Sequence, residues 1–411
     1  MSPDPKSRAL GHTAPARRFQ PPTLRGITMP GAADRHRERP KGRPEPVAVL
    51  IGQLSQGGSE RQLFMFLSHC DRTRWAPEVY VSGELGFWEE HIRSLGIPVR
   101  LLTGGRLAKM RQLRAACAAQ GIRYFFSWSS YTNPFGLALL GMDVWRIGSF
   151  RNALFADLPA RLRPAWAWAS LSAISLAVCN SKETYDEIAL RKAARPKPIY
   201  IPNGVEPPAI DQIAVWRATW RARLGIGDGV VLVVGVGRLA KQKRFDRFIQ
   251  VIERARKEVP VEAVVAGEDF GCLQDLERQV AQSNLNEAVR FIGAVPDARE
   301  LISAADILLL SSDHEGMPNV VLEAMSVSVP SVVTRVNSVA DLIEHGETGF
   351  IADHDADDLA RHVVRLATDC GLRRHVGERA RSAVMLRHDS RAIAHQLWAL
   401  CDARDTGGIT R

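Results

Sequence analysis

From residue 47 onward, short runs of aliphatic and β-branched residues alternate with longer amphipathic segments. The runs before residue 200 cover 47–54, 78–82, 99–102, 124–126 and 176–179. Helical patterns lie between them, for example at 60–67, 107–119 and 183–190. None of the runs alternates strictly between apolar and polar side chains, so we expect strands that are buried on both faces. Buried strands that are each followed by a helix are typical of a parallel sheet in an α/β domain.

The same pattern starts again after the segment Ile201-Pro202-Asn203-Gly204. The new strand candidates cover 230–236, 261–265, 289–292, 307–310 and 331–334. This repetition predicts two doubly wound, Rossmann-like domains, at 47–205 and 206–385, with a joint near 204–210. For 386–411 we expect a C-terminal helix and tail, with packing back toward the first domain as one option. Ligands of such folds bind beyond the carboxyl ends of the strands, so two facing domains would enclose a substrate cleft.

The basic surplus of the chain is concentrated near its start. The formal net charge is +9, and residues 1–46 hold ten Lys or Arg against four Asp or Glu, with 9 of the 23 prolines. Because this segment has few large apolar residues, it cannot offset its ordering entropy, and we expect a disordered basic tail. It has no apolar stretch of the kind that a secretory signal needs. The surplus by itself leaves nucleic acid, an anionic membrane and a phosphorylated substrate as partner classes.

Neither the cysteines nor the longest uncharged stretch signals a special environment. The six cysteines are Cys70, Cys117, Cys179, Cys272, Cys370 and Cys401. None has the C-x-x-C spacing of a zinc or redox site, so we expect reduced, buried thiols in a cytoplasmic protein. The uncharged stretch 164–181 contains four serines and divides into a Trp/Ala part and a Val/Leu part. We interpret it as a helix followed by a strand rather than as a membrane span.

The second domain opens with a strand that runs into glycines and then into basic residues. Gly235 and Gly237 are followed by Arg238 and Lys243. Glycines let a phosphate approach the backbone, and the next helix offers free amides and positive potential. Gly235, Gly237 and Ala240 also fit a loose dinucleotide fingerprint, but the acidic residue that should follow about 20 positions later comes about 30 positions later. A tight turn with surface charges is the third interpretation of this segment.

A second polar loop follows the apolar run 307–310 and leads into a helix. Pro318 lies near the first helical position, where its missing amide costs nothing. Glu315 precedes this helix, and Glu323 lies within it among Val, Leu, Ala and Met side chains. A carboxylate in such apolar surroundings needs partners, and sugar hydroxyls are suitable ones.

With these residues in place, the chain resembles the retaining glycosyltransferases of family 4, which have the two-domain GT-B architecture. The resemblance covers nearly all of 47–400. It rests on Gly57-Gly58 after the first strand, the 201–205 segment, the Gly237–Lys243 motif, Ala266-Gly267-Glu268, the 289–293 and 346–350 segments, and the E-x7-E pair Glu315 and Glu323.

The resemblance implies a role for each matching residue. Arg238 and Lys243 would hold the diphosphate of a nucleotide sugar, Glu323 would bind the ribose, and Glu315 would contact hydroxyls of the donor sugar. The donor-side residues that complete this set are Gly57, Gly58, Gly237, Gly316, Met317, Pro318 and Asn319. The implied reaction transfers a hexose from a nucleotide sugar and retains the configuration at the anomeric carbon. A UDP-linked donor is expected over a GDP-linked one. Positive charges and amide dipoles would stabilise the departing diphosphate, so no cofactor and no metal is expected.

The acidic run at 353–358 looks like a metal-binding D-x-D motif, but a helix start accounts for it better. Asp355 or a neighbour would serve as N-cap, with further acidic residues in the first turn of a helix over 359–367.

Two positions depart from the family pattern. Trp128 stands where the family often has a histidine that contacts the donor sugar, which leaves the sugar's identity open. Its ring would either stack on a sugar on the acceptor side or be a core or rim aromatic. Asp341 stands in a loop where the family usually has a glutamate, and would replace it with a shorter reach.

The acceptor should lie on the first domain. The basic, amphipathic segment 106–114 and the tryptophans next to arginines in 161–168 would suit anionic lipid headgroups, or else form a solvated helix face and partly buried rings. We therefore expect a sugar or lipid-linked sugar acceptor in surface polysaccharide or glycoconjugate synthesis, with the enzyme cytoplasmic or at the inner face of the membrane.

Two alternative functions are a dinucleotide-dependent oxidoreductase that uses 235–240 and a basic nucleic-acid binder. We expect no nucleic acid as a partner, because most of the charge surplus lies in the tail.

Overall fold

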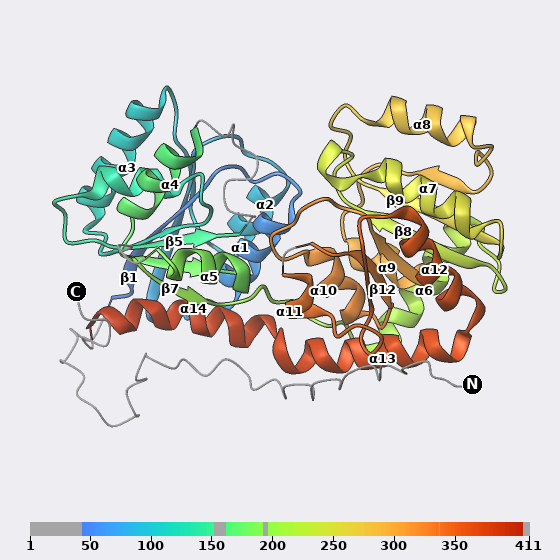
Figure 1. Ribbon diagram of the computed structural model, residues 1–411. Coiled ribbons are helices and arrows are strands. Elements are labelled where there is room, and N and C mark those ends of the chain that lie inside the picture. The colour runs from blue at the N-terminus through green and yellow to red at the C-terminus, as the bar shows by residue number, and fades with distance from the viewer. Residues whose placement is uncertain (1–42, 152–161, 192–195, 337, 406–411) are drawn as a thin grey trace, which may run out of the picture.

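The computed structural model describes residues 43–151, 162–191, 196–336 and 338–405. Two parallel sheets lie side by side, each covered by helices on both faces (Figure 1). Residues 1–42, which make up most of the predicted tail, lie outside the described residues. The prediction placed residues 45 and 46 in this tail, which is wrong, because the first strand begins at Glu45.

The first sheet has seven strands. They are β1 (Glu45–Ile51), β2 (Trp75–Val81), β3 (Val99–Leu101), β4 (Tyr124–Ser127), β5 (Trp145–Phe150), β6 (Leu176–Cys179) and β7 (Lys197–Tyr200). The helices of this domain are α1 (Gly58–Ser68), α2 (Phe87–Ser94), α3 (Arg106–Gln120), the 3-10 helix η1 (Asn133–Leu139), α4 (Arg163–Ser172) and α5 (Lys182–Ala189). The stretch 164–181 is thus a helix and then a strand, as predicted.

The second sheet has six strands. They are β8 (Val231–Val236), β9 (Val261–Ala266), β10 (Val289–Phe291), β11 (Ile307–Leu310), β12 (Ser331–Thr334) and β13 (Phe350–Ala352). The helices of this domain are α6 (Ile210–Leu224), the 3-10 turn η3 (Lys241–Lys243), α7 (Phe245–Ala255), α8 (Leu273–Gln282), α9 (Ala298–Ala304), α10 (Asn319–Ser326), α11 (Val339–Leu342), α12 (Ala356–Thr368) and α13 (Cys370–Arg387). The last helix of the chain is α14 (Ser390–Asp405), which packs on the first domain.

Both sheets have the doubly wound strand order. The first runs β3-β2-β1-β4-β5-β6-β7 and the second β10-β9-β8-β11-β12-β13, and every strand pair is parallel. The order reverses between β1 and β4 and between β8 and β11. Crevices for ligands form at these switch points, beyond the carboxyl ends of the strands. The predicted α/β architecture is confirmed.

Most strands with buried aliphatic side chains were predicted, whereas two strands with polar residues and the buried, three-residue strand β13 were missed. β11 and β12 have the predicted bounds, and all four residues of each are buried. β5, β7 and β13 were not predicted. β5 contains Arg146, Gly148 and Ser149, and β7 is a half-exposed edge strand, so neither has the continuous apolar signature of a central parallel strand.

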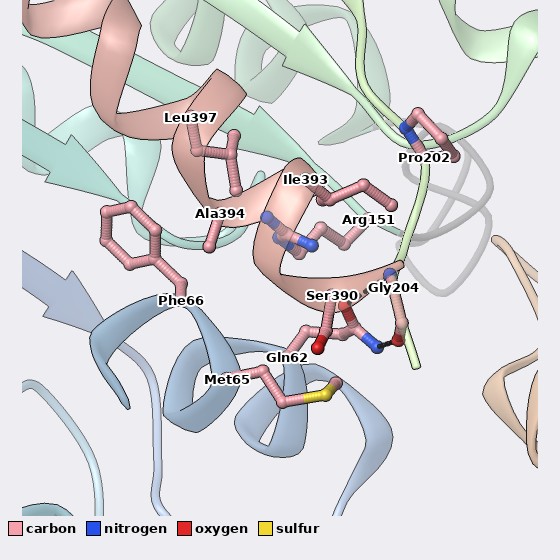
Figure 2. Close-up of a pocket in the computed structure, with 10 residues that line it drawn as sticks. All are labelled: Gln62, Met65, Phe66, Arg151, Pro202, Gly204, Ser390, Ile393, Ala394 and Leu397. Carbon is pink, nitrogen blue, oxygen red and sulfur yellow. Dashed lines mark hydrogen bonds between the residues drawn. The ribbon is translucent and has the colours of Figure 1, made fainter. Parts of the chain in front are cut away.

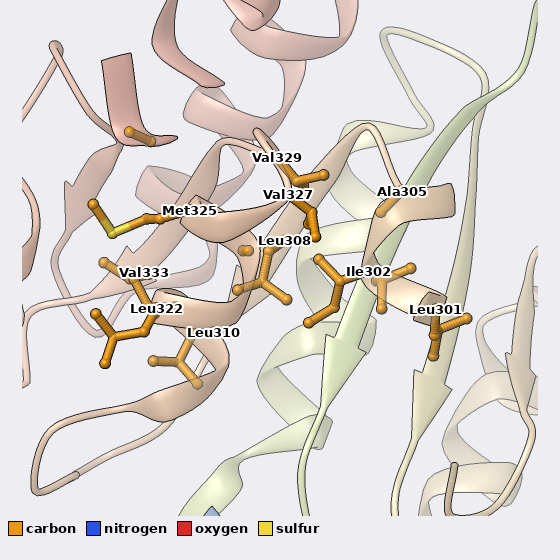
Figure 3. Close-up of a cluster of buried hydrophobic side chains, with 14 of the residues drawn as sticks. Leu301, Ile302, Ala305, Leu308, Leu310, Leu322, Met325, Val327, Val329 and Val333 are labelled. Carbon is orange, nitrogen blue, oxygen red and sulfur yellow. The ribbon is translucent and has the colours of Figure 1, made fainter. Parts of the chain in front are cut away.

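Apolar side chains fill the space between each sheet and its helices. In the second domain one cluster joins α9, α10, α13 and one face of the sheet, and another joins α7, α8, α12 and the opposite face. Figure 3 shows the first cluster, where Leu322 and Met325 of α10 lie near Leu308 and Leu310 of β11. This packing holds α10, which carries Glu323, in a fixed place beneath the interdomain face.

The chain crosses between the domains twice, and the two crossings lie side by side. The outward crossing is 201–209, and the return lies between α13 and α14. Val205 N donates to His388 O (2.8 Å), and Asn203 O lies 2.9 Å from His388 Nδ1. Beyond the return, α14 lies along the first domain (Figure 1), and its Trp398 stacks on Phe66 of α1 at 4.3 Å between ring centroids. The C-terminal helix therefore belongs to the core of the first domain.

None of the helices in the described ranges is both long enough and apolar enough to span a membrane. All six cysteines are described, and none forms a disulfide. Cys117, Cys179 and Cys401 are buried, but Cys370 is exposed, so the expectation of buried thiols is wrong for Cys370.

Candidate active site

The predicted site residues gather at the facing carboxyl-terminal edges of the two sheets. Gly57 and Gly58 follow β1, and Gly237 and Arg238 follow β8. Glu315 lies in the loop between β11 and α10. These loops leave the sheets at the two switch points, which explains why residues so far apart in sequence meet.

Lys243 and Glu315 form an ion pair at this edge. Lys243 Nζ lies 2.6 Å from Glu315 Oε1, and Ser312 Oγ donates to the same oxygen at 2.7 Å. Both side chains are mostly buried, with 16% and 11% of their surfaces exposed. The predicted phosphate-binding lysine and the predicted sugar-binding glutamate therefore share one small polar site.

Hydrogen bonds hold the loop that carries Glu315 onto the loop that carries Lys243. Ser311 Oγ donates to Lys243 O (3.0 Å), and Gln242 Nε2 donates to His314 O (2.6 Å). Arg247 donates to Ser311 O and pairs with Asp313. Because each loop is tied to the other, the distance between Lys243 and Glu315 is set by the fold.

Arg238 and Gly237 lie at the end of β8. Arg238 is exposed, and its Cζ lies 5.1 Å from the centroid of the Phe270 ring. Gly237 has φ +154 and lies against the Lys243 side chain. Its conformation disfavours a residue with a Cβ. Two cations thus flank the glycine, as a diphosphate site requires.

The residues before and at the start of α10 mostly face other protein groups. Met317 is buried in the core, and its sulfur accepts a hydrogen bond from Asn203 N. Asn319 Oδ1 accepts from Asn203 Nδ2 (2.9 Å) and Gln62 Nε2 (3.1 Å). Gly316 O accepts from Ser338 Oγ. Pro318 is the N-cap residue, one position before the predicted helix start.

Gly57 and Gly58 place the start of α1 directly against the second domain. A Cβ added to Gly58 would clash with the Asn319 amide, and one added to Gly57 would clash with the Glu60 carboxylate. Burial raises the pKa of Glu60, although Arg238 from the opposite domain opposes this rise. Gly58 therefore allows a close approach between the domains, whereas Gly57 makes room for Glu60 of the same helix.

Glu323 is 7% exposed and forms an ion pair across the domain boundary. Its Oε1 lies 2.9 Å from Nη1 of Arg61, and Nη2 of the same arginine lies 3.2 Å from Asp297 Oδ1. Burial raises the pKa of Glu323, and the Arg61 guanidinium partly counters that rise. Sequence reasoning missed both Arg61 and Asp297. The available signal was that Arg61 falls one turn into a helix that starts at the glycine pair.

Trp128 is a core residue. Its ring is 0% exposed, it stacks on Phe66, and Arg151 Cζ lies 3.8 Å from its centroid. Its Nε1 donates to Ser59 O (2.9 Å). The expected acceptor-side stacking does not fit, because no face of the ring is open to a sugar. The core interpretation is the correct one.

Arg151 is the unusual charge near this site. It is buried, donates to Asn203 Oδ1 (3.1 Å), and none of the described carboxylates forms an ion pair with it. Burial lowers the pKa of Arg151 to about 9. It also lines a cavity of about 10 Å³, close to the minimum that one water molecule needs, with Gln62, Gly204 and Ser390 (Figure 2). This cavity lies beside the domain crossings and is too small for a sugar.

The remaining two predicted features are structural. Asp341 Oδ2 accepts a hydrogen bond from Lys182 N at the start of α5, so it joins the two domains. Asp355 is the N-cap of α12 and accepts from Asp358 N, which confirms the helix-start interpretation of the acidic run. Within the described ranges, no three His, Cys, Asp or Glu side chains are grouped so that they could hold a metal ion.

Comparison with known proteins supports the family assignment. Residues 217–383, which include η3, Glu315 and Glu323, match the family described as "Glycosyl transferases group 1". The chain carries a group 1 glycosyltransferase domain. The predicted resemblance is thereby confirmed, and the domain is the one that contains most of the predicted donor-side residues.

Relatives of the group 1 domain act in several biosyntheses. The chain is 29% identical over 175 residues to N-acetyl-alpha-D-glucosaminyl L-malate synthase of Bacillus anthracis, an alignment that covers 42% of this chain and 45% of the synthase. It is 29% identical over 174 residues to the lipopolysaccharide core biosynthesis glycosyltransferase LpsE of Rhizobium meliloti, covering 42% and 50%. The chain thus spans about half the length of these curated relatives.

The two-domain fold extends the likeness beyond the group 1 domain. The structure of Anabaena Alr3699/HepE in complex with UDP and glucose superposes with a TM-score of 0.77 at 19% identity, covering 87% of this chain and 100% of that one. At this identity the comparison shows a shared GT-B fold.

Proposed function

We propose that this chain is a retaining glycosyltransferase that moves a hexose from a nucleotide sugar, UDP-linked rather than GDP-linked, to a sugar or lipid-linked sugar. The observation that carries the proposal is the Lys243–Glu315 pair, at 2.6 Å, beside Arg238 and the start of α10. It brings a diphosphate-binding cation and a hydroxyl-binding carboxylate together at a switch point. A dinucleotide-binding loop gives no reason for that carboxylate.

The proposed reaction assigns the charges as follows. Lys243 and Arg238 bind the diphosphate and stabilise the negative charge that grows on it as the bond from the anomeric carbon to the phosphate oxygen breaks. The free amides at the start of α10 add to this positive potential. Glu315 accepts hydrogen bonds from donor-sugar hydroxyls. The acceptor oxygen forms its bond from the same face, and its proton passes to the departing diphosphate oxygen.

The donor chemistry proposed here needs no metal. Two full positive charges and the amides of one helix supply the stabilisation that a divalent cation supplies in other enzymes. Of the Asp353-His354-Asp355 D-x-D motif, Asp355 is instead engaged as the N-cap of α12, and Asp353 forms an ion pair with Arg335.

The acceptor is proposed to be lipid-linked, on account of the surface of the first domain. Leu107 of α3 and Trp168 of α4 are 70% and 68% exposed, and Leu162 lies just before α4. Arg106 Cζ lies 5.2 Å from the Trp166 ring, so basic and aromatic side chains meet where the two helices adjoin. Exposed apolar groups among basic ones are suited to anionic headgroups.

Calorimetry with UDP, GDP, NAD and a DNA duplex tests the proposal. We expect UDP to bind, and we expect Arg238→Ala or Lys243→Ala to weaken it about 10- to 100-fold, the effect of losing a hydrogen bond to a charged group. Arg254→Ala, which removes an exposed ion pair with Asp357, serves as the matched control. Binding of NAD or DNA but of neither nucleotide would overturn the proposal.

A donor-panel hydrolysis assay then identifies the sugar. We expect the hydrolysis rate to be unchanged after dialysis against EDTA. Complete loss of activity that Mn²⁺ restores would refute the metal-independent mechanism while leaving the transferase assignment in place.

A further inference from the structure

Arg61 connects the two domains through Glu323, the residue that is predicted to bind the ribose of the donor. It lies in the first turns of α1, in the first domain, and its guanidinium reaches two carboxylates of the second domain. Only 16% of the Arg61 side chain is exposed. An arginine that spans two carboxylates with separate nitrogens has a defined orientation, because its planar fork fixes both contacts at once.

Among the described residues, hydrogen-bond donors reach only one of the two carboxylate oxygens of Glu323. Oε1 accepts the hydrogen bond from Arg61 Nη1, whereas no described residue donates a hydrogen bond to Oε2. Glu323 lies in the middle of α10, whose apolar face is packed against the core, so the side chain has little freedom to move. Oε2 is not among the fully buried side-chain atoms that lack a partner, so part of its surface is open to a hydrogen-bond donor from outside the chain.

The contact does not depend on Glu323 alone. Asp297, the other partner of Arg61, is the N-cap of α9 and also pairs with Arg299 at 2.6 Å. Its pKa is lowered to about 2, since the hydrogen bonds and charges of Arg299 and Arg61 outweigh its burial. Arg61 is therefore anchored to a carboxylate that stays ionised near neutral pH.

We propose that Arg61 is a positioning residue for the donor nucleotide: it holds the Glu323 carboxylate so that Oε2 accepts a hydrogen bond from a ribose hydroxyl. The inference rests on the proposed function. Its consequence is that the first domain, expected to serve the acceptor, also sets the affinity for the donor. Docking α1 onto the second domain would then complete the nucleotide site.

Electrostatics give this role a pH signature. The charged groups near Glu323 are Arg61 from α1, Asp297 and Arg299 from the start of α9, and Arg381 of α13, which donates to Ser326 O at the far end of α10. Burial raises the pKa of Glu323, and Arg61 is the leading group that lowers it. Without Arg61 the pKa rises further, so the carboxylate loses its charge at a higher pH.

The test measures the Kd of a nucleotide sugar from pH 5 to 9 for Arg61→Met. The phosphates of a nucleotide sugar are diesters and do not titrate in this range, so they add no pH dependence. We expect binding about 10- to 100-fold weaker than wild type at neutral pH. We also expect the affinity of the variant to keep increasing with pH above the range where wild type is constant. Arg61→Lys, which keeps the charge but not the fork, should have a Kd between the two.

A double-mutant cycle separates positioning from simple domain docking. In the E323Q background, Arg61→Met should change the Kd by less than about threefold, because the carboxylate that it positions has gone. In the D297N background, Arg61→Met should keep most of its effect. Equal non-additivity with both partners, or a pH profile of Arg61→Met that is parallel to wild type, would overturn the inference.

Two further outcomes are decisive. Tighter binding by Arg61→Met would mean that Arg61 competes with the ribose, and the inference would be wrong. Failure of the wild-type protein to bind any nucleotide sugar would refute the proposed function, and the inference with it.

The control variant is Arg93→Met. Arg93 is an exposed arginine of α2 that pairs with Glu89, so this substitution removes one positive charge from the first domain away from the proposed site.

Discussion

At the scale of single residues, the site relies on buried charges that neutralise one another. Lys243 and Glu315 pair in the second domain, and Arg61 and Glu323 pair across the boundary. A buried ion pair contributes little to stability when both partners are present, but removing one partner leaves an uncompensated charge that costs several kcal/mol. Such pairs are retained where their charges have a task. Sequence motifs had singled out both members of the first pair and Glu323 of the second.

Glu315→Gln tests whether the negative charge of Glu315 is needed for the reaction. The substitution keeps the shape of the side chain but removes the charge opposite Lys243 and weakens the acceptor for sugar hydroxyls. We expect turnover to decrease about 10- to 100-fold with a smaller change in nucleotide affinity. Steady-state transfer kinetics and calorimetry would measure the two quantities.

The control for this variant is Glu347→Gln, which removes an exposed carboxylate paired with Arg379. A wild-type kcat for Glu315→Gln, in a protein with unchanged thermal stability, would show that Glu315 has no role in the transfer step.

At the scale of elements, the close approach of α1 and α10 depends on a glycine. Gly58 is the first residue of α1 and lies against the Asn319 side chain, whose oxygen is held by Gln62 and Asn203. Asn319 cannot turn away without losing these hydrogen bonds. Gly58 therefore acts through packing between two helices as well as through any approach of a phosphate.

Gly58→Ala should disturb this contact. The new methyl group clashes with the Asn319 amide, so α1 has to move away from α10 and the Arg61–Glu323 distance increases. We expect nucleotide affinity to decrease about tenfold, in line with the loss of one charge-assisted hydrogen bond, while the melting temperature changes by only a few degrees.

Gly52→Ala is the matched control, because it lies in the same loop region and its added Cβ would meet no atom within 4 Å. If both glycine variants bind nucleotide with wild-type affinity, the close packing of α1 on α10 is not needed for donor binding.

At the scale of the whole molecule, the two domains are joined by two chain crossings, by α14 and by contacts across the facing edges. α14 returns to the first domain and places Trp398 on Phe66. Gln56, Arg61, Gln62 and Lys182 each contact the second domain. The two domains are therefore mechanically linked, and the exposed α3–α4 surface has a fixed place relative to the second domain.

Binding to vesicles tests the surface formed by α3 and α4. The double variant Leu107→Ser with Trp168→Ser should bind vesicles of anionic phospholipid at least about fivefold more weakly at low salt, since burying a large apolar side chain is worth about 1.5–3 kcal/mol. Leu386→Ser, an exposed leucine of α13, is the control. Vesicle sedimentation would measure the effect, and a wild-type protein that ignores anionic vesicles would refute the proposed membrane contact.

The sequence by itself determined the architecture and which residues were predicted to lie on the donor side. Buried strands such as β11 and β12 are visible as apolar runs, because strands covered on both faces need no polar residues. Local signals also predicted the cap at Asp355, since capping involves residues only three positions apart. Glycines and basic residues next to a strand end indicated a phosphate site for the same local reason.

Only the tertiary structure decided which partners these residues meet. Trp128 is a core residue because Phe66 and Arg151 cover its two sides, and those residues lie far away in the sequence. Arg61 faces Glu323 across 262 positions. Pairings of this kind depend on how two domains dock, and docking is set by the sum of many long-range contacts rather than by any local pattern. Periodicity reports the face that a helix buries, whereas the identity of the group on the other side comes from the fold alone.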